Sequence, residues 1–565
     1  MRIRVPLLLT FFALLLGACT DYRQDPLQPP LDALASKAGA PEPIPPRSED
    51  LAGYWELMTD EELWQHLQAQ DGQAVIGIKN PGEARGIWRN RVLVSAATLR
   101  GAEVVLRARS DVEVLQAYER PPFIVLRIES PDALSAIRAL PFRDYLQPLY
   151  MDTGSGSGMM DGCGWSETYT GGAPLSSWGD PIPPGLARMG IRDAWRRNAG
   201  ENAVIGVTDT GVSLDQANLR ANFATGASAN GRWHEIITVV SGGTQDYCGH
   251  GTRLAGLSFA PKNGSSMVGA AWKANAVSVR QGDGVSTSGG LNSAFVTAAI
   301  NTAVSATPNP NFDHHRRIVS MAWGAASSHS NVEDAIRDNH GRGALFFGAS
   351  GTSGWFTWSG VVFPATMREV VAVSAVNPDG SRVSNVHYGS QVELAAYVDQ
   401  LGTGQFTTQI RTVAGSSAAT AAMSGIAALV WTQYPNLTNE QVRRRLQWAG
   451  HIHPSRNDTH GYGIVNAFKA VGGMHAVRID APFWVDPYSS FTVTAEPLGG
   501  TGPFSYQWSN GATTRSTTYT AGGEWSTVDY SVRVTDAFDG ATRTGAGTSY
   551  AQDRSGCEDE SMIVC

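Results

Sequence analysis

Residues 415–425 read Gly-Ser-Ser-Ala-Ala-Thr-Ala-Ala-Met-Ser-Gly, a run made almost entirely of small side chains. Small side chains let a helix approach its neighbours closely, so the run predicts a tightly packed helix. Two hydroxyl groups stand side by side at its head, on Ser416 and Ser417. The stretch alone allows two interpretations, a purely structural helix or a helix that presents a reactive serine. The surrounding sequence decides between them.

The chain around this run alternates between short apolar segments and helical stretches. Short apolar runs are typical of buried parallel strands, and their alternation with helices predicts a doubly wound α/β fold with a mostly parallel sheet. Helices are expected at residues 293–305 and 331–339. The expected strands are residues 203–208, 276–280, 318–322, 344–347 and 370–375.

Two further segments of this α/β region carry reactive side chains. The segment AVIGVTDTGV (203–212) places Asp209 on the turn after a strand, and CGHGTRLAG (248–256) sets His250 between two glycines. Either residue alone is more often structural than functional. In open α/β sheets, however, functional groups collect at the carboxyl ends of strands. An aspartate, a histidine and a serine in this chain order match the order of the catalytic residues in subtilisin.

The chain resembles the subtilisin-like serine peptidases at all three segments. Its DTG turn, its HGT-x-x-AG segment and its GSSAATAAMSG run match the motifs that carry the acid, the base and the nucleophile of that family. The resemblance implies a catalytic triad of Asp209, His250 and Ser417, and it puts Ser416 on a non-catalytic threonine of the family. We expect a helix to begin at Ser417, so that its backbone N–H and its positive dipole end face the oxyanion.

The resemblance extends over about residues 186–471. The segments MVGAAWKANAVSVR and HYGSQVELAA are similar to other parts of the family sequence, and IVSMAWG is similar to the strand that binds the substrate backbone. This last likeness implies that Ala322, Trp323 and Gly324 bind substrate. The resemblance therefore implies a serine endopeptidase that acts on proteins or peptides through an acyl-enzyme.

The chain also departs from the family pattern. The family's oxyanion asparagine lies in an A-G-N-x-G turn, and FFGASGTSG places Thr352 at that position. Threonine keeps a hydroxyl donor on a shorter side chain, whereas loss of the donor in subtilisin costs about 10² to 10³ in turnover. Asn218 replaces a calcium-ligand aspartate of some members, so we expect no metal or other cofactor, calcium having no recognisable site. These departures leave an alternative open, a catalytically weak or inactive subtilisin-fold scaffold that acts as a surface binding protein.

An unrelated class of peptidase also uses DTG sequences. Aspartic peptidases carry two DTG loops, and a second DTG begins at Asp152. Too few residues separate it from Asp209 to build two lobes, and the surroundings of the two aspartates differ. We therefore exclude an aspartic peptidase.

The segments that flank the expected catalytic domain, residues 186–475, differ from it in pattern. Residues 51–150 read as a small α+β domain, and they stand where subtilisin-like enzymes carry an inhibitory propeptide, which implies a zymogen with its own propeptide as a partner. Residues 151–185 are a connector rich in glycine and serine. Residues 476–550 alternate like the strands of a small Ig-like or PKD-like β-sandwich, and residues 551–565 form a tail with two cysteines.

The N-terminus predicts export. Arg2 and Arg4 precede an apolar run at residues 5–16 that is too short to span a bilayer, so residues 1–18 are expected to be a signal peptide. The sequence LGAC at its end resembles the lipobox of bacterial lipoproteins, which implies that Cys19 is acylated and anchors the protein to a membrane. Residues 19–50 are rich in proline and read as a tether. The expected location is the outer membrane or cell surface, or the medium after processing.

Charge and cysteine content limit the expected partners and the possible disulfides. The net charge is −8 and no long basic run occurs, so nucleic acid is not an expected partner. If Cys19 carries lipid, the other cysteines are left to form disulfides in an oxidising compartment. Cys163, Cys248, Cys557 and Cys565 allow three pairings. A bond between Cys557 and Cys565 would close a short loop and would leave Cys163 for Cys248.

Overall fold

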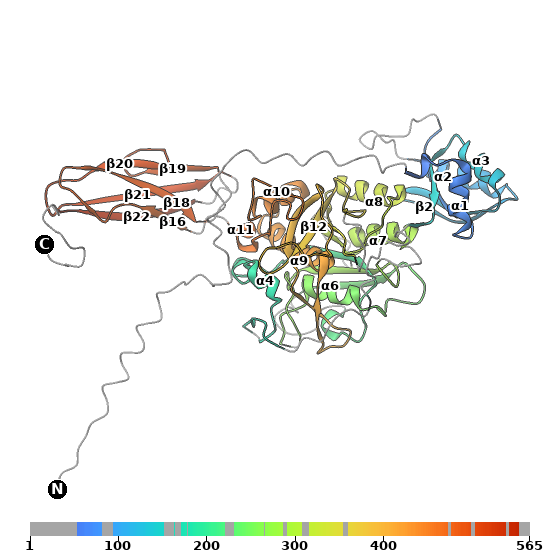
Figure 1. Cartoon of the computed structure of the whole chain (residues 1–565), viewed down its shortest axis with the longest axis horizontal. Coiled ribbons are helices and arrows are strands. Elements are labelled where there is room, and N and C mark those ends of the chain that lie inside the picture. Colours follow the sequence, from blue (N-terminus) through green and yellow to red (C-terminus); the bar gives the residue numbers. More distant parts are fainter. Residues whose placement is uncertain are drawn as a thin grey trace, which may run out of the picture. The chain divides into compact units, whose positions relative to one another are not determined.

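The structure is a computed structural model in which three regions are described (Figure 1). The expected signal peptide and tether (residues 1–50, with Cys19), most of the expected connector and the two cysteines of the tail lie outside the described residues. The described residues are 54–81, 94–151, 163, 171–177, 179–220, 231–264, 266–285, 291–307, 316–353, 360–472, 476–498, 503–537 and 542–552.

The N-terminal region is a small α+β unit. Its strands form an antiparallel sheet in the order β2-β3-β1-β4, and its helices cover one face of that sheet. The first helix starts with a capping box, in which the side chains of Thr59 and Glu62 each accept the other residue's backbone N–H. The elements are a 3-10 turn at Tyr54–Glu56, α1 (Asp60–Gln68), β1 (Gln73–Ile78), α2 (Ala96–Arg107), β2 (Val112–Glu119), β3 (Pro122–Ile128), α3 (Pro131–Arg138) and β4 (Arg143–Pro148).

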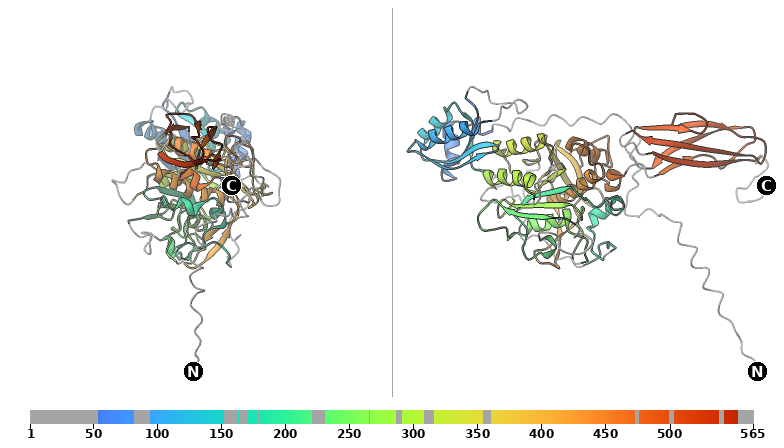
Figure 2. Two further views of the ribbon diagram at one scale, coloured as in Figure 1. Left: turned by 90° about the vertical axis from the view of Figure 1, so that its left-hand side faces the viewer. Right: turned by 180° about the vertical axis from the view of Figure 1, so that it is seen from behind.

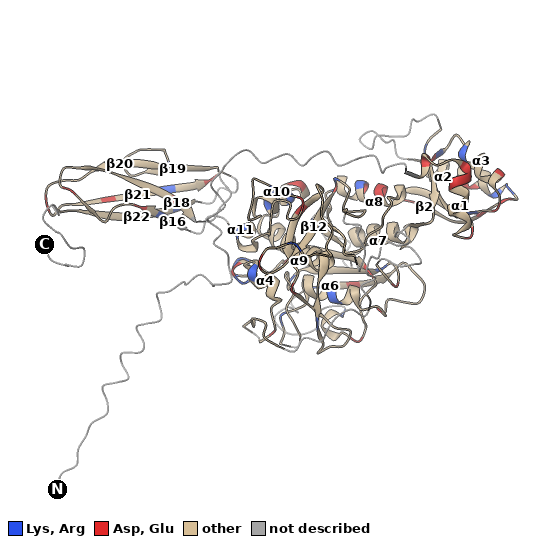
Figure 3. Cartoon of the chain, viewed as in Figure 1, with Lys and Arg blue, Asp and Glu red and all other residues tan. Residues whose placement is uncertain are grey.

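The central region is built on a parallel sheet, as the sequence predicts. Among the described residues its strands follow the order β13-β12-β11-β10-β6-β8-β7, and every neighbouring pair is parallel. In Figure 3 few residues of these strands are coloured as charged, and more are on helices such as α8 and α10, as expected for a sheet buried on both faces. The strands are β6 (Val204–Asp209), β7 (His234–Thr238), β8 (Asn275–Arg280), β10 (Arg317–Met321), β11 (Leu345–Ala349), β12 (Val370–Val376) and β13 (Val392–Tyr397).

Helices cover both faces of this sheet (Figure 2). Successive strand residues point to opposite faces, so Ile318 packs in one hydrophobic core with α6 and α9, whereas Val319 packs in a second core with α7 and α8. The result is a three-layer α/β/α arrangement, the subtilisin-like fold that the sequence predicts. The helices are α4 (Pro184–Arg188), α5 (Ile191–Ala194), α6 (His250–Phe259), α7 (Ser293–Ser305), α8 (Ser330–Gly341), α9 (Gly415–Gln433), α10 (Asn439–Trp448) and α11 (Ala467–Val471), with a 3-10 turn at Ala217–Leu219.

Helix α9 begins earlier than the sequence predicts. We expected it to start at Ser417, but the helix starts at Gly415 and Ser417 is its third residue. Gly415 has a φ of +76°, and a Cβ atom there would lie 2.7 Å from the Thr352 hydroxyl. Glycine is therefore required where the chain enters the helix. The N–H of Ser417 still belongs to the first turn, where backbone N–H groups have no partner within the helix.

Short two-stranded pairings lie beside the central sheet. Strand β5 (Tyr150–Met151) pairs antiparallel with β9 (Leu291–Asn292), and β14 (Gln400–Thr403) pairs antiparallel with β15 (Ile410–Val413). The first pairing joins the end of the N-terminal region to the segment that leads into α7.

The C-terminal region consists of two small sheets packed face to face. Their orders are β16-β18-β20 and β17-β22-β21-β19, and the core between them contains Phe491, Val493, Trp508 and Val532. Strand β19 alternates outward and inward residues, which is the sandwich pattern that the sequence predicts. The strands are β16 (Ala476–Asp480), β17 (Trp484–Val485), β18 (Ser490–Leu498), β19 (Phe504–Trp508), β20 (Ser516–Thr520), β21 (Thr527–Asp536) and β22 (Thr542–Ala551).

Candidate active site

Asp209 and His250 form a hydrogen-bonded pair at the carboxyl edge of the central sheet. Asp209 is the last residue of β6, and His250 is the first residue of α6. His250 Nδ1 lies 2.8 Å from Asp209 Oδ1, and the exposed fractions of the two residues are 4% and 1%. The same oxygen accepts the N–H of Thr210 at 2.8 Å. The buried carboxylate therefore fixes the orientation of the imidazole ring, with Nε2 on the opposite side of the ring.

Two glycines let α6 approach this aspartate. Gly249 precedes the helix in the left-handed conformation, with a φ of +82°. At Gly251, a Cβ atom would lie 2.3 Å from the carbonyl oxygen of Gly211 and 3.1 Å from Asp209 Oδ1. The backbones meet there without a side chain between them, and the N–H of Gly251 donates to the Thr210 hydroxyl at 2.9 Å. The glycines that flank His250 in the sequence thus serve the close approach of helix and strand.

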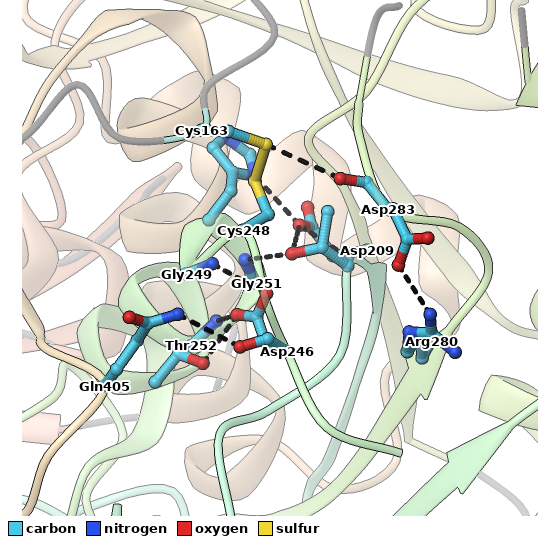
Figure 4. Close-up of a disulfide and its surroundings, with 12 residues drawn as sticks. Cys163, Asp209, Asp246, Cys248, Gly249, Gly251, Thr252, Arg280, Asp283 and Gln405 are labelled. Atoms are coloured by element: carbon cyan, nitrogen blue, oxygen red, sulfur yellow. Dashed lines mark hydrogen bonds and ion pairs between the residues drawn. A yellow bond between two sulfur atoms is a disulfide. The ribbon is translucent and has the colours of Figure 1, made fainter. Parts of the chain in front are cut away.

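A second buried carboxylate, Asp246, holds the turn that precedes His250 (Figure 4). Its side chain accepts the N–H of Gly249 at 2.7 Å, and the N–H and hydroxyl of Thr252 at 2.9 and 2.6 Å. Burial raises the pKa of Asp246, while these hydrogen bonds oppose that shift. Gln405, from the loop after β14, donates to the Asp246 carbonyl oxygen at 3.0 Å. Sequence reasoning missed this residue, although its contacts with Gly249 and Thr252 are local in the chain.

A disulfide joins Cys163 of the connector to Cys248, two residues before His250 (Figure 4). The sulfur of Cys163 also lies 3.5 Å from the carbonyl oxygen of Asp283. Asp283 in turn pairs with Arg280, the last residue of β8. The connector is therefore tied down at one residue beside the Asp209–His250 pair.

Ser417 lies at the same edge of the sheet. Its hydroxyl donates to the carbonyl oxygen of Ala322 at 3.1 Å. Ala322 follows β10, the neighbour of β6, and the register that pairs Ser320 with Val207 puts Ala322 level with Asp209. Asp209 thus ends β6 and His250 starts α6. Ser417, in the first turn of α9, contacts the residue that follows the neighbouring strand β10. Ser417 is partly exposed, whereas Ser416 is buried.

Ser416 is bound into a polar cluster with Thr352. The N–H of Ser416 donates to Thr352 Oγ1 at 3.1 Å, and the two hydroxyl oxygens are also 3.1 Å apart. The N–H of Gly351 donates to Ser416 Oγ at 3.0 Å. Thr352 therefore contacts the residue that precedes Ser417 on α9, and the cluster joins the segment after β11 to the start of that helix. The sequence placed Thr352 near the serine but did not reveal the role of Ser416 as its partner.

The segment Ala322–Gly324, expected to bind substrate, follows β10 directly. Ala322 and Trp323 are 3% and 2% exposed. The indole N–H of Trp323 donates to the hydroxyl of Thr208 at 3.0 Å, so the side chain turns into the sheet. The side chains of Ala322 and Trp323 are therefore buried, and the Ala322 carbonyl accepts from Ser417.

Asn218, which the resemblance places at a calcium-ligand position, is hydrogen-bonded by protein groups. Its amide nitrogen donates to Gln216 Oε1 at 3.1 Å and to the Thr407 carbonyl at 2.8 Å. Its amide oxygen accepts from Asn263 at 2.9 Å. In the described part of the chain, no group of three or more His, Cys, Asp or Glu side chains is arranged to hold a metal ion.

None of the described helices has the length and apolar character needed to cross a membrane.

Comparison with known proteins agrees with this geometry. Residues 200–465 match the family model described as the subtilase family. A thermostable alkaline protease of Halalkalibacterium halodurans is 29% identical over 291 residues, which cover 51% of this chain and 73% of the relative. Subtilisin BL of Lederbergia lenta is 28% identical over 295 residues, 51% of this chain and 98% of the relative. The minor extracellular protease Epr of Bacillus subtilis is 26% identical over 399 residues, 68% of this chain and 55% of the relative.

The family match covers the part of the α/β region that carries Asp209, His250 and Ser417. The comparisons support a serine peptidase of the subtilisin type, and with it protein or peptide substrates.

Proposed function

We propose that this protein is a serine endopeptidase that uses Ser417 as nucleophile, His250 as general base and Asp209 as the group that orients the base. The observation that carries the proposal is the buried 2.8 Å contact between His250 Nδ1 and Asp209 Oδ1, on the sheet edge where Ser417 is partly exposed. The intact set of three residues, together with the subtilase match, favours an active enzyme over a binding scaffold.

The proposed reaction follows from the positions of the protons. His250 keeps a proton on Nδ1 for Asp209, so its Nε2 is free to take the proton of Ser417 as Oγ attacks the substrate carbonyl carbon. The bond to the amine half breaks when His250 returns that proton to the leaving nitrogen. Water, activated by the same histidine, then hydrolyses the acyl-enzyme and frees Ser417. Asp209 stabilises the imidazolium in both steps.

The oxyanion of the tetrahedral intermediate needs hydrogen-bond donors. The first-turn N–H of Ser417 is one, because it has no acceptor within the helix. We propose the hydroxyl of Thr352 as the second. In this arrangement Ser416 Oγ donates its own proton to Thr352 Oγ1, which leaves the Thr352 proton for the oxyanion.

We further propose that residues 51–150 act as a propeptide and that the protein is made as a zymogen. The N-terminal sheet packs its outer face, including Val75, Phe123 and Tyr145, against Ala294 of α7. The side chain of Gln147 donates to Asn331 of α8 at 2.7 Å in a buried contact. The β5–β9 pairing then leads the chain toward the connector that is tied beside His250. These contacts support a chaperone-like and inhibitory role.

Export and anchoring complete the proposal. We infer that residues 1–18 are a signal peptide, that Cys19 carries lipid, and that the enzyme works at the outer membrane or cell surface or is released after processing. The disulfide between Cys163 and Cys248 supports export, because disulfides are typical of an oxidising compartment. One matched relative is named as an extracellular protease.

A second function, a catalytically weak or inactive scaffold for surface binding, is favoured by one observation. The hydroxyl of Thr352 is engaged with both the N–H and the Oγ of Ser416. If the Thr352 hydroxyl donates its proton to Ser416 Oγ, the oxyanion has no side-chain donor from this position, and turnover falls.

The test compares the two adjacent serines. Ser417→Ala should abolish peptide hydrolysis and, if maturation is autocatalytic, the shortening of the precursor. Ser416→Ala is the matched control, since it removes the same atom one residue away, and it should retain substantial activity. Equal loss in both variants would contradict the assignment.

A further inference from the structure

A buried histidine outside the proposed triad, His387, lies in a segment that pairs with the residues around Thr352. His387 is 1% exposed and belongs to the chain between β12 and β13. The preceding residue, Val386, forms an antiparallel bridge with Thr352. The N–H of Ser353 donates to the carbonyl oxygen of Asn385 at 2.9 Å. The segment that follows β11 is therefore hydrogen-bonded along its length to the segment that contains His387.

His387 binds the residues on both sides of Thr352. Its backbone N–H donates to the carbonyl oxygen of Gly351 at 3.0 Å, and its own carbonyl oxygen accepts the hydroxyl of Ser350 at 3.0 Å. Its ring Nε2 is hydrogen-bonded to the hydroxyl of Ser353. One residue thus makes hydrogen bonds to positions 350, 351 and 353, and Thr352 lies within the run that it holds.

The imidazole ring of His387 lies directly against the backbone of Gly351. A Cβ atom added at Gly351 would lie 2.3 Å from His387 Nδ1 and 2.7 Å from its Cγ. Gly351 also has a φ of +120°, a conformation that favours glycine. The ring therefore occupies the place that a side chain at position 351 would need, one residue before Thr352.

The hydrogen bonds of the His387 ring fix its proton. Nδ1 lies 2.8 Å from the carbonyl oxygen of Gly360, which only accepts, so Nδ1 carries the proton. Nε2 of the neutral ring is then an acceptor, and the Ser353 hydroxyl donates to it. Burial lowers the pKa of His387 below its ordinary value of 6.5, although the bond to the Gly360 carbonyl opposes that shift. The ring is therefore neutral and holds Ser353 as an acceptor.

We propose that His387 is a positioning residue, which holds Thr352 Oγ1 where it donates to the oxyanion. The inference rests on the proposed peptidase function, with Thr352 as the side-chain donor. On its other side, Thr352 Oγ1 accepts the N–H of Ser416 at 3.1 Å. The hydroxyl is therefore held between the start of α9 and the segment that His387 binds. A displacement of about 1 Å at a reacting group costs about a hundredfold in rate, so the position of this hydroxyl should affect turnover.

The experiment separates the two ring contacts of His387 in the full-length protein, with a peptide p-nitroanilide as substrate. His387→Asn keeps a donor near the position of Nδ1 but loses the bond to Ser353, whereas His387→Gln keeps an acceptor near the position of Nε2. We expect His387→Asn to lower kcat about tenfold with little change in KM. His387→Gln should lose less, because it keeps the contact with Ser353. Ser353→Ala removes the same hydrogen bond from the other side and should match His387→Asn.

His234 supplies the matched control. It is also 1% exposed, and its ring has partners of the same two kinds. Nδ1 lies 2.6 Å from the carbonyl oxygen of Leu219, and Nε2 lies 2.8 Å from the hydroxyl of Ser278. It belongs to β7, the edge strand of the central sheet. His234→Asn should therefore lower the melting temperature as His387→Asn does, but keep the kcat of the wild type.

A double-mutant cycle shows whether His387 acts through the Thr352 hydroxyl. Thr352→Val lacks that hydroxyl, so the added His387→Asn substitution should lower kcat by less than about twofold. The same substitution in the wild type should lower kcat by about tenfold. The cycle is repeated with Ser353→Ala, which keeps the test valid if His387→Asn does not fold.

The outcomes separate this inference from the peptidase itself. Equal losses of kcat with and without the Thr352 hydroxyl would overturn the inference, and so would a wild-type kcat in folded His387→Asn and Ser353→Ala variants. A loss of kcat in His234→Asn as large as that in His387→Asn would overturn it too, because kcat would then follow stability alone. If Thr352→Val has the kcat of the wild type, the inference fails while the enzyme stands. No cleavage of any peptide, with no labelling of Ser417 by phenylmethylsulfonyl fluoride, would instead reject the peptidase, and the inference with it.

Discussion

Replacing Thr352 with valine keeps the shape of the side chain and removes one hydroxyl. That hydroxyl accepts the N–H of Ser416 at 3.1 Å and lies 3.1 Å from Ser416 Oγ. Because Ser416 Oγ already accepts the N–H of Gly351, it is able to donate its own proton to Thr352. The Thr352 proton then remains for the oxyanion. The substitution therefore removes a donor in the transition state and an acceptor in the free enzyme.

The two losses differ in kind and in size. A donor that acts mainly on the transition state lowers kcat with little change in KM. The short reach of threonine leads us to expect a ten- to hundredfold loss of kcat, about 1.4 to 2.7 kcal/mol. The lost acceptor leaves the N–H of Ser416 unpaired, and Ser416 is 1% exposed. This costs about 1 to 3 kcal/mol in the free energy of unfolding, which appears as a lower melting temperature.

Steady-state kinetics and thermal melting on four proteins separate these effects. Thr352→Asn supplies a longer hydrogen-bond donor and should match or exceed the wild type in kcat. Ser416→Ala disturbs the same cluster but keeps the Thr352 hydroxyl, so it should lose stability and retain substantial kcat. If Thr352→Val has the kcat of the wild type, Thr352 is not the donor. If the wild type is inactive and Thr352→Asn hydrolyses peptides, the scaffold function is favoured.

Three further predictions concern the disulfide, the anchor and acid stability. Peptide mapping without reduction should recover Cys163 and Cys248 linked, and separate unlinked peptides would reject the bond. Cys19→Ala should move the protein from the membrane fraction to the soluble fraction, whereas a soluble wild type with an unmodified N-terminal region would refute the anchor. Burial lowers the pKa of His234 to about 3 and that of His329 to about 4, from ordinary values of 6.5. As the pH falls, the unfolded chain protonates these histidines before the folded protein does. The free energy of unfolding should therefore be at its full value above pH 6.5 and should fall toward pH 4. The slope should be up to about 1.4 kcal/mol per pH unit for each histidine. Urea denaturation across this range measures the slope, and a flat profile would contradict the burial of both rings.

Much of the fold follows from short apolar runs, and the exceptions have physical causes. Helix α7 has the predicted bounds because its length and apolar pattern are both clear. Strand β7 was not predicted, since it is an edge strand with partly exposed residues. Strand β13 was not predicted either, because it contains a glutamate. That residue, Glu393, is fully buried and pairs with Arg443 of α10. The charge of Glu393 is offset by a partner on a helix distant in the chain, which the sequence of the strand itself does not reveal.

The site was predictable where the chemistry lies within a short motif. Asp209 stands in a DTG turn, His250 between two glycines and Ser417 in a run of small residues. Close approach of backbones requires small residues nearby. Asp246 was missed although its contacts with Gly249 and Thr252 are local in the chain. Ser416 could not be recognised as the partner of Thr352, because their contact joins segments that are distant in the chain.

Covalent labelling tests the identity of the nucleophile without any chosen substrate. A fluorophosphonate reacts with a serine only where a base activates its hydroxyl and donors stabilise the resulting tetrahedral centre. The full-length protein is treated with the probe, digested and mapped by mass spectrometry, with Asp209→Asn as a control in which the imidazole loses its orienting carboxylate. We predict one adduct, on Ser417, that forms far more slowly in the control. An adduct on Ser416, or no adduct on a folded wild-type protein, would contradict the proposed peptidase.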